Sequence, residues 1–221
     1  MKGPARDELP QDGQPASSSP SEIAHYWSEL PGPVWFSAAA IYARQVAEAA
    51  EGDTFVELGA WKGRSTACMA VEIARSGKSI RFFTVDHWRG TSEPAQLADP
   101  DLRENRLYET FLRNIAPVRD YVEPIRARTV DAARKFDDGA VAFVYVDAGH
   151  GYADVRADLS AWWPKIKPGG RMAGDDWCDY DENYGVRRAV SEFFAEYGAA
   201  VSVEPGDPNP DWLQWVVEKR A

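Results

Sequence analysis

The stretch FVELGAWKGRS, residues 55 to 65, connects a short apolar segment to a segment with helical character. Thr54–Leu58 is predicted to be a buried strand, and Ser65–Arg75 a helix. Gly59 and Gly63 allow the backbone between them to turn tightly against whatever lies beside it. The stretch therefore predicts a strand–loop–helix unit of the kind that opens an α/β domain.

The loop does not have the glycine spacing of a dinucleotide-binding fingerprint. That fingerprint would require glycines at positions 61 and 64, where this chain has Trp61 and Arg64. A pyrophosphate could not approach such a backbone closely. A nicotinamide-dependent oxidoreductase on a similar sheet is therefore an alternative that the loop disfavours.

Strands and helices are expected to alternate along the rest of the chain. Further strands are predicted at Arg81–Val85, Tyr121–Ile125, Val141–Val146, Arg171–Ala173, Ala200–Val203 and Leu213–Glu218, with helices near 35–50, 107–115, 130–136, 155–163 and 186–197. The last two strands have no helix between them, so they should form an antiparallel hairpin. The predicted fold is α/β: a Rossmann-like, doubly wound, mostly parallel sheet with a C-terminal antiparallel hairpin. Ligands of such sheets bind beyond the carboxyl ends of the strands.

Composition limits the class of protein. The chain has 221 residues, of which 44% are hydrophobic, so residues 22–221 are expected to form one domain. Residues 1–21 are rich in Pro, Ser, Gly and Gln and are predicted to be a disordered tail. The net charge of -10 argues against nucleic acid as a partner. The two cysteines suit a cytoplasmic protein, and the sequence has no apolar run of the ~20 residues that a membrane helix needs.

The glycine loop and the acid that ends the second strand together form a more specific pattern than the loop alone. The pattern Glu57-x-Gly59-x-x-x-Gly63, followed by Asp86, resembles the first two motifs of class I S-adenosylmethionine-dependent methyltransferases. The resemblance implies that the loop accommodates the methionine part of the cofactor and that Asp86 holds the ribose hydroxyls. A carboxylate can accept both hydroxyl hydrogen bonds.

This resemblance supplies a set of expected cofactor-binding residues. They are Glu57, Gly59, Ala60, Trp61, Gly63, Ser65, Asp86, His87, Trp88 and Asp147. Trp88 has two interpretations, because an indole at that position can cover an adenine ring or pack in the core.

Three aspartates follow the fourth and fifth predicted strands. Asp147 ends one strand, and Asp175 and Asp176 end the next. Neighbouring strands lie ~4.8 Å apart, so these carboxylates should converge at one edge of the sheet. They would repel one another unless they are protonated or bound to a cation, and oxygen ligands suit Mg²⁺. Taken singly, each aspartate could instead cap a helix.

The aspartates and a nearby histidine also resemble a known branch of the fold. An Asp-x-x-His after strand four, here Asp147 and His150, with an acidic pair after strand five, resembles the metal-dependent O-methyltransferases related to macrolide sugar O-methyltransferases and cephalosporin-biosynthesis proteins. The resemblance implies that Asp147, Asp175 and Asp176 bind a divalent metal and that His150 is the catalytic base. An imidazole with the ordinary pKa of ~6.5 suits proton removal near neutral pH.

The expected function is methyl transfer from S-adenosylmethionine to a hydroxyl of a small molecule. The polar segment 89–100 is predicted to be a lid, and Trp177, Tyr180 and Tyr184 are candidates for stacking on the acceptor. A non-catalytic or accessory protein that binds S-adenosylmethionine remains the alternative. The acceptor, the pathway and homo-oligomerisation are left open.

Overall fold

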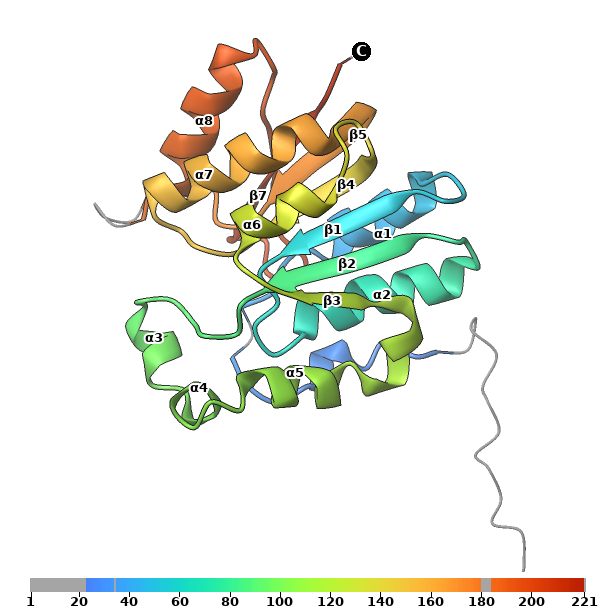
Figure 1. The fold of residues 1–221 in the computed structure, drawn as a ribbon, viewed down its shortest axis with the longest axis vertical. Helices are drawn as coiled ribbons and strands as arrows, with labels where there is room; N and C mark the ends of the chain where they lie inside the picture. Colours follow the sequence, from blue (N-terminus) through green and yellow to red (C-terminus); the bar gives the residue numbers. More distant parts are fainter. Residues whose placement is uncertain (1–22, 34, 180–183, 221) are drawn as a thin grey trace, which may run out of the picture.

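The computed structural model describes residues 23–33, 35–179 and 184–220, so the predicted tail lies outside the described residues. Its centre is a seven-stranded sheet in the order β3-β2-β1-β4-β5-β7-β6 (Figure 1). The strands are β1 (Thr54–Leu58), β2 (Arg81–Asp86), β3 (Glu123–Arg126), β4 (Val141–Val146), β5 (Ile166–Gly174), β6 (Ser202–Pro205) and β7 (Leu213–Glu218). The first five are parallel, and β7 runs antiparallel to both β5 and β6. The predicted fold is confirmed.

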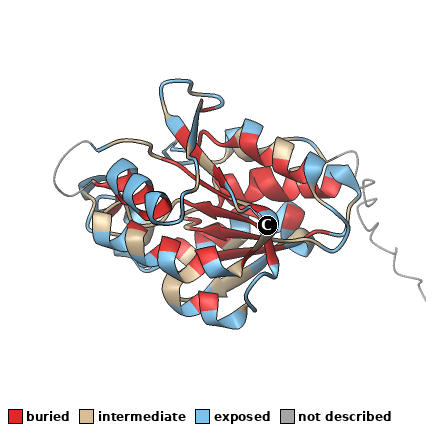
Figure 2. Cartoon of the chain, turned by 90° about the horizontal axis from the view of Figure 1, so that it is seen from above, coloured by how far each residue is buried: buried red, intermediate tan, exposed pale blue. Residues whose placement is uncertain are grey.

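Helices cover both faces of this sheet (Figure 1). One face carries α1 (Ala39–Glu48), α2 (Arg64–Ser76) and α5 (Leu107–Asn114), and the other carries α6 (Thr129–Ala132), α7 (Tyr152–Trp162) and α8 (Val186–Glu196). Short helical turns complete the described chain: η2 (Trp27–Glu29), α3 (Pro94–Leu97), α4 (Pro100–Arg103), η3 (Ala116–Tyr121), η4 (Ala133–Lys135) and η5 (Trp163–Lys165). Each long helix turns its buried side to the sheet, as Figure 2 shows, so the core consists of two apolar layers.

The sequence of the central strand β4 explains why it lies in the interior of the protein. All six of its residues, Val141–Val146, are buried, and an apolar strand of this kind is typical of a sheet covered on both faces. Two helices that pack together, α7 and α8, cover one side of it. The core therefore holds β4 rigidly up to its last residue.

The predicted starts of two elements, β5 and α1, differ from the structure by several residues. The β5 strand begins at Ile166 and not at Arg171, because the Pro168-Gly169-Gly170 turn forms an irregularity within the strand, where its register to β4 shifts. The α1 helix begins at Ala39 and not near residue 35. Residues 35–37 are not helical, and Ala38 forms a β-bridge with Asp207.

The register of the parallel strands places their loops at a common edge. Leu58 at the end of β1 pairs with Val85 and with Val146, and Val146 pairs with Gly174 at the end of β5. The residues that follow β1, β2, β4 and β5 therefore emerge side by side. This edge holds the candidate site.

No helix among the described residues has the length and apolar character needed to cross a membrane.

Candidate functional site

A cavity of about 1470 Å³ opens at the carboxyl edge of the sheet. Sites for one small molecule are usually roughly 300–1,000 Å³, so this cavity has room for a cofactor and a second molecule together. Its lining includes many of the residues singled out by sequence, namely Gly59, Ala60, Trp61, Ser65, Asp86, His87, Asp147, His150, Asp176, Trp177 and Tyr184. Tyr180 lies outside the described residues.

The glycine loop is shaped by its contact with the end of β4. Gly59 has a φ of +89°, and a Cβ placed on it would lie 1.8 Å from the carbonyl oxygen of Asp147. Gly63, with a φ of +86°, precedes α2, and a Cβ there would meet Ile115 at 2.9 Å. Only glycine fits such a position without displacing its neighbours. Gly63 does not line the cavity, so its role is to pack α2 closely against Ile115.

Asp86 holds the glycine loop in place. Its Oδ2 accepts hydrogen bonds from the backbone N–H groups of Ala60 and Trp61, both at 3.0 Å. Its Oδ1 accepts one from the N–H of Trp88 at 2.6 Å. A carboxylate has about four acceptor positions, so capacity remains for a ligand hydroxyl. The predicted ribose contact of Asp86 stays a prediction, and its role in ordering the loop is an addition to it.

Glu57 and Trp88, which were also expected to contact the cofactor, lie in the interior. Glu57 is 1% exposed and accepts hydrogen bonds from the hydroxyls of Tyr42, Thr66 and Thr84. Burial raises the pKa of this carboxyl to about 7, against the opposing effect of those hydroxyls. Trp88 packs among aromatic rings in the core and donates its indole N–H to the backbone of the glycine loop. Neither lines the cavity, so the structure does not place Glu57 or Trp88 among the candidate cofactor contacts.

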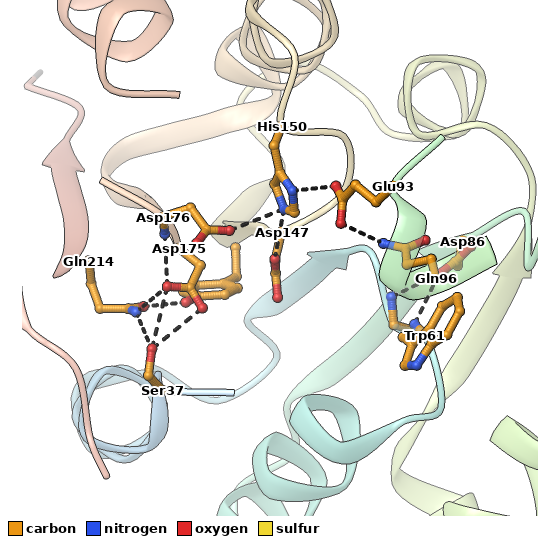
Figure 3. A network of polar contacts seen from close by, with 12 residues as sticks. Ser37, Trp61, Asp86, Glu93, Gln96, Asp147, His150, Asp175, Asp176 and Gln214 are labelled. Atoms are coloured by element: carbon orange, nitrogen blue, oxygen red, sulfur yellow. Dashed lines mark hydrogen bonds and ion pairs between the residues drawn. The ribbon is translucent and has the colours of Figure 1, made fainter. Parts of the chain in front are cut away.

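The polar cluster at the ends of β4 and β5 consists of Asp147, His150 and Asp176 (Figure 3). His150 Nε2 lies 3.1 Å from Asp176 Oδ2 and 3.6 Å from Asp147 Oδ1. One ligand atom from each of the three residues lies within 4.8 Å of the other two. On the opposite side of the ring, His150 Nδ1 lies 2.7 Å from Glu93 Oε1. The imidazole is thus placed between carboxylates, with the Tyr184 ring at 4.7 Å.

Asp175 lies outside this cluster, so the structure does not place it beside the other two aspartates predicted to bind the metal. It is 5% exposed and points toward Ser37 and Gln214, away from His150 (Figure 3). Consecutive side chains at a strand end point to opposite sides, and the left-handed backbone of Asp176 (φ +60°) turns the chain there. Asp175 Oδ1 accepts the N–H of Asp176 at 2.8 Å, so it supports the neighbouring carboxylate.

The charges around His150 determine its protonation. Burial alone would lower its pKa, but the carboxylates of Asp147 and Glu93 and the charge of Asp176 outweigh burial and raise it to about 11. The imidazole is therefore protonated at neutral pH in the metal-free protein. This pKa differs from the ordinary value of ~6.5 that was expected, and the role of His150 as a base stays a prediction.

The cluster has the chemistry of a cation site. The Nε2 atom of His150 is buried and has no aligned hydrogen-bond partner within the described chain, although two carboxylates face it. If Nδ1–H donates to Glu93, the Nε2 lone pair would face two negative charges unless a proton or a metal ion lies between them. The residues present therefore fit a divalent cation held by two carboxylates and one imidazole.

Sequence reasoning did not find Glu93, which belongs to the long connection between β2 and α5. Gln96 of the same connection donates its side-chain N–H to Glu93 Oε2 at 3.4 Å. Lys62 of the glycine loop pairs with both Asp99 and Asp101 at 2.8 Å. The only signal in the sequence was the polar character of residues 89–100, which predicted a lid and no particular contact.

Residues 56–177, just over half of the chain, match the sequence profile of a methyltransferase domain family. The chain belongs to this methyltransferase domain family. A protein of Sinorhizobium fredii named as uncharacterized protein y4gI is 27% identical over 143 residues, which are 63% of this chain and 15% of that protein. The chain thus spans about 15% of the length of that curated relative.

Several solved structures share the fold. The O-methyltransferase NovP superposes with a TM-score of 0.63 at 18% identity, covering 83% of this chain and 79% of NovP. The cofactor-bound protein Rv0187 from MTB has a TM-score of 0.62 at 16% identity, covering 93% of each chain. An O-methyltransferase from Bacillus cereus, solved with SAH, has a TM-score of 0.57 at 14% identity, covering 88% and 87%.

These comparisons confirm the predicted class I methyltransferase at the level of family and fold. At such identities the structural likeness is one of fold. The family leaves the nicotinamide-dependent alternative without support.

Proposed function

We propose that this protein transfers a methyl group from S-adenosylmethionine to a hydroxyl oxygen of a small molecule, with a divalent cation in the site. One observation carries the proposal: the Asp147, His150 and Asp176 cluster lines the same cavity as the glycine loop and Asp86. Two proteins of similar fold, NovP and the Bacillus cereus protein, are O-methyltransferases, which supports the proposal. The branch related to macrolide sugar O-methyltransferases and cephalosporin-biosynthesis proteins stays a prediction.

The cofactor half of the cavity is assigned to the glycine loop and the end of β2. Gly59, Ala60 and Trp61 form its floor because Asp86 fixes their backbone. Ser65 and His87 line the same region. These residues bind the cofactor and orient its methyl group; the positioning of donor and acceptor in line supplies much of the rate enhancement in a displacement of this kind.

The acceptor half is assigned to the surroundings of Asp147 and Asp176. A divalent cation held by these carboxylates lowers the pKa of a hydroxyl that binds it. Bound S-adenosylmethionine would supply the methyl group to the acceptor oxygen, and the hydroxyl proton would leave to water in the open cavity. Trp177 and Tyr184 line this part and are proposed to contact the acceptor.

A small-molecule acceptor is proposed because the net charge of -10 repels nucleic-acid phosphates and the cavity has room for a cofactor and a second small molecule. A second oxygen on the acceptor would let it chelate the cation, as a sugar diol or a catechol does. The cytoplasmic location and homo-oligomerisation stay predictions. The accessory protein that binds the cofactor without transfer remains the second candidate, because it would need the same cofactor residues.

The test is an incubation with methyl-labelled S-adenosylmethionine and a divalent metal against glycosides, catechols and hydroxy acids. We expect label on an acceptor oxygen, and its loss with a chelator. Cofactor binding by calorimetry without transfer to any acceptor favours the accessory protein. A protein that does not bind S-adenosylmethionine contradicts both candidates.

A further inference from the structure

Neither ring nitrogen of His150 has a free face toward the cavity. Nδ1 lies 2.7 Å from Glu93 Oε1, and Nε2 is buried between Asp147 and Asp176 beneath the Tyr184 ring. A general base must come within about 2.6–3.2 Å of the proton that it removes. In this arrangement an acceptor hydroxyl cannot reach either nitrogen, although a bare metal ion between the side chains can.

The spacing of the three ligand atoms suits one metal ion. Adjacent ligands of an octahedral ion with bonds of about 2.1 Å are separated by about 3.0 Å. His150 Nε2 lies 3.1 Å from Asp176 Oδ2 and 3.6 Å from Asp147 Oδ1. All three ligand atoms lie within 4.8 Å of one another, so the longer separations would have to shorten when the metal binds. Nε2 has no aligned hydrogen bond within the described residues that a metal would have to break.

We propose that His150 is the third protein ligand of the cation, through Nε2, and not the base of the reaction. The inference rests on the proposed function, because it concerns the cation of that site. Glu93 is then a positioning residue: it accepts the Nδ1–H of His150 and so keeps the Nε2 lone pair directed at the ion. A metal-bound histidine commonly donates its other ring N–H to a carboxylate in this way.

An imidazole ligand changes which metal the site prefers. Carboxylates and water suit Mg²⁺, whereas imidazole favours later divalent metals such as Fe²⁺, Co²⁺ and Zn²⁺. With one nitrogen and two carboxylates, this site is assigned to a transition-metal ion in preference to Mg²⁺, which the sequence had indicated. The acceptor oxygens and water complete the coordination.

The decisive experiment uses Mn²⁺ as a paramagnetic probe of the full-length protein. Electron spin-echo envelope modulation detects the nitrogen of a histidine bound directly to Mn²⁺. We expect nitrogen coupling in the wild-type protein, no such coupling in His150→Gln, and unchanged coupling in His87→Gln, the other histidine that lines the cavity. The wild-type spectrum is informative even if a variant does not fold.

Titration calorimetry with Co²⁺ and Mg²⁺ gives the second readout. His150→Gln should narrow the preference for Co²⁺ over Mg²⁺ by at least about tenfold, because only the nitrogen ligand is lost. Mn²⁺ that binds without nitrogen coupling, or coupling that persists in His150→Gln, overturns the inference and leaves the proposed methyl transfer standing. A protein that binds none of the metals overturns the inference together with the cation of the proposed function.

Discussion

Glu93 and His150 are 57 positions apart in the chain, and yet Glu93 Oε1 lies 2.7 Å from His150 Nδ1. The contact links the connection after β2 to the loop after β4. It also lowers the pKa of Glu93, because the hydrogen bond to the imidazole favours the charged carboxylate. The segment that carries Glu93 is therefore connected to the candidate cation site by a specific side-chain pair.

Removing this contact should weaken metal binding. Glu93→Ala is expected to lower Mn²⁺ affinity by about 10–100-fold, because the imidazole loses the partner that orients it. Glu93→Gln should retain most of the affinity, since its amide oxygen can accept the same N–H. Glu104→Ala, at an exposed position in the same connection, is the matched control. If calorimetry finds equal Mn²⁺ affinity for Glu93→Ala and Glu104→Ala, Glu93 does not position His150 for metal binding.

Gly59 is expected to be essential for folding. Gly59→Ala places a Cβ 1.8 Å from the Asp147 carbonyl and forces a φ of +89°, so it should cost several kcal/mol in free energy of unfolding. Gly52→Ala is the control, because Gly52 also has a positive φ (+80°) but nothing within 4 Å of the added Cβ. The control should lose only about 1–2 kcal/mol. Urea unfolding that gives the same loss for both variants would show that the close approach to Asp147 is not real.

Asp86 should affect both the cofactor and the loop. Asp86→Ala leaves the backbone N–H groups of Ala60 and Trp61 without their acceptor and removes the candidate ribose contact. We expect at least about tenfold weaker binding of S-adenosylmethionine, together with about 1–3 kcal/mol lower stability. Calorimetry and chemical unfolding measure the two effects. If Asp86→Ala folds and binds S-adenosylmethionine with wild-type affinity, the assignment of Asp86 to the cofactor site is wrong.

The buried Asp158 should make stability fall as pH rises. Burial raises its pKa from 3.8 to about 7, although the Thr129 hydroxyl partly opposes this. Between those values the folded state holds a proton that the unfolded state has lost, so stability decreases from about pH 4 to pH 7. Asp158→Asn should flatten this decrease in the metal-free protein, and the exposed Asp137→Asn should not. The denaturant midpoint of unfolding, measured across this pH range, tests the prediction. If the midpoint falls equally steeply with pH in the wild type and in Asp158→Asn, the prediction is wrong.

The fold could be predicted from local patterns because they agree with the tertiary packing. The apolar runs at β1, β2 and β4 have the length of buried strands, and their ends were placed within one residue. The Pro168-Gly169-Gly170 segment was misplaced, because a turn signal does not reveal that a strand continues through it.

The site was predicted less completely, for two physical reasons. Asp175 and Asp176 are chemically identical neighbours, and the sequence does not show which carboxylate faces His150, because this depends on the turn of the folded chain at Asp176, where φ is +60°. Glu93 meets His150 through tertiary structure alone, so no spacing in the sequence points to it. The raised pKa of His150 has the same origin, since it depends on three carboxylates from different parts of the chain.

The central claim is that one cavity brings S-adenosylmethionine and a divalent cation together for transfer to oxygen. Mass spectrometry of the labelled acceptor, with wild-type protein and with Asp176→Asn, tests it most directly. We predict label on a hydroxyl oxygen with wild-type protein, its loss on chelation, its return with added metal, and loss of transfer but not of cofactor binding in Asp176→Asn. Label transfer that persists after chelation and in Asp176→Asn would contradict the account.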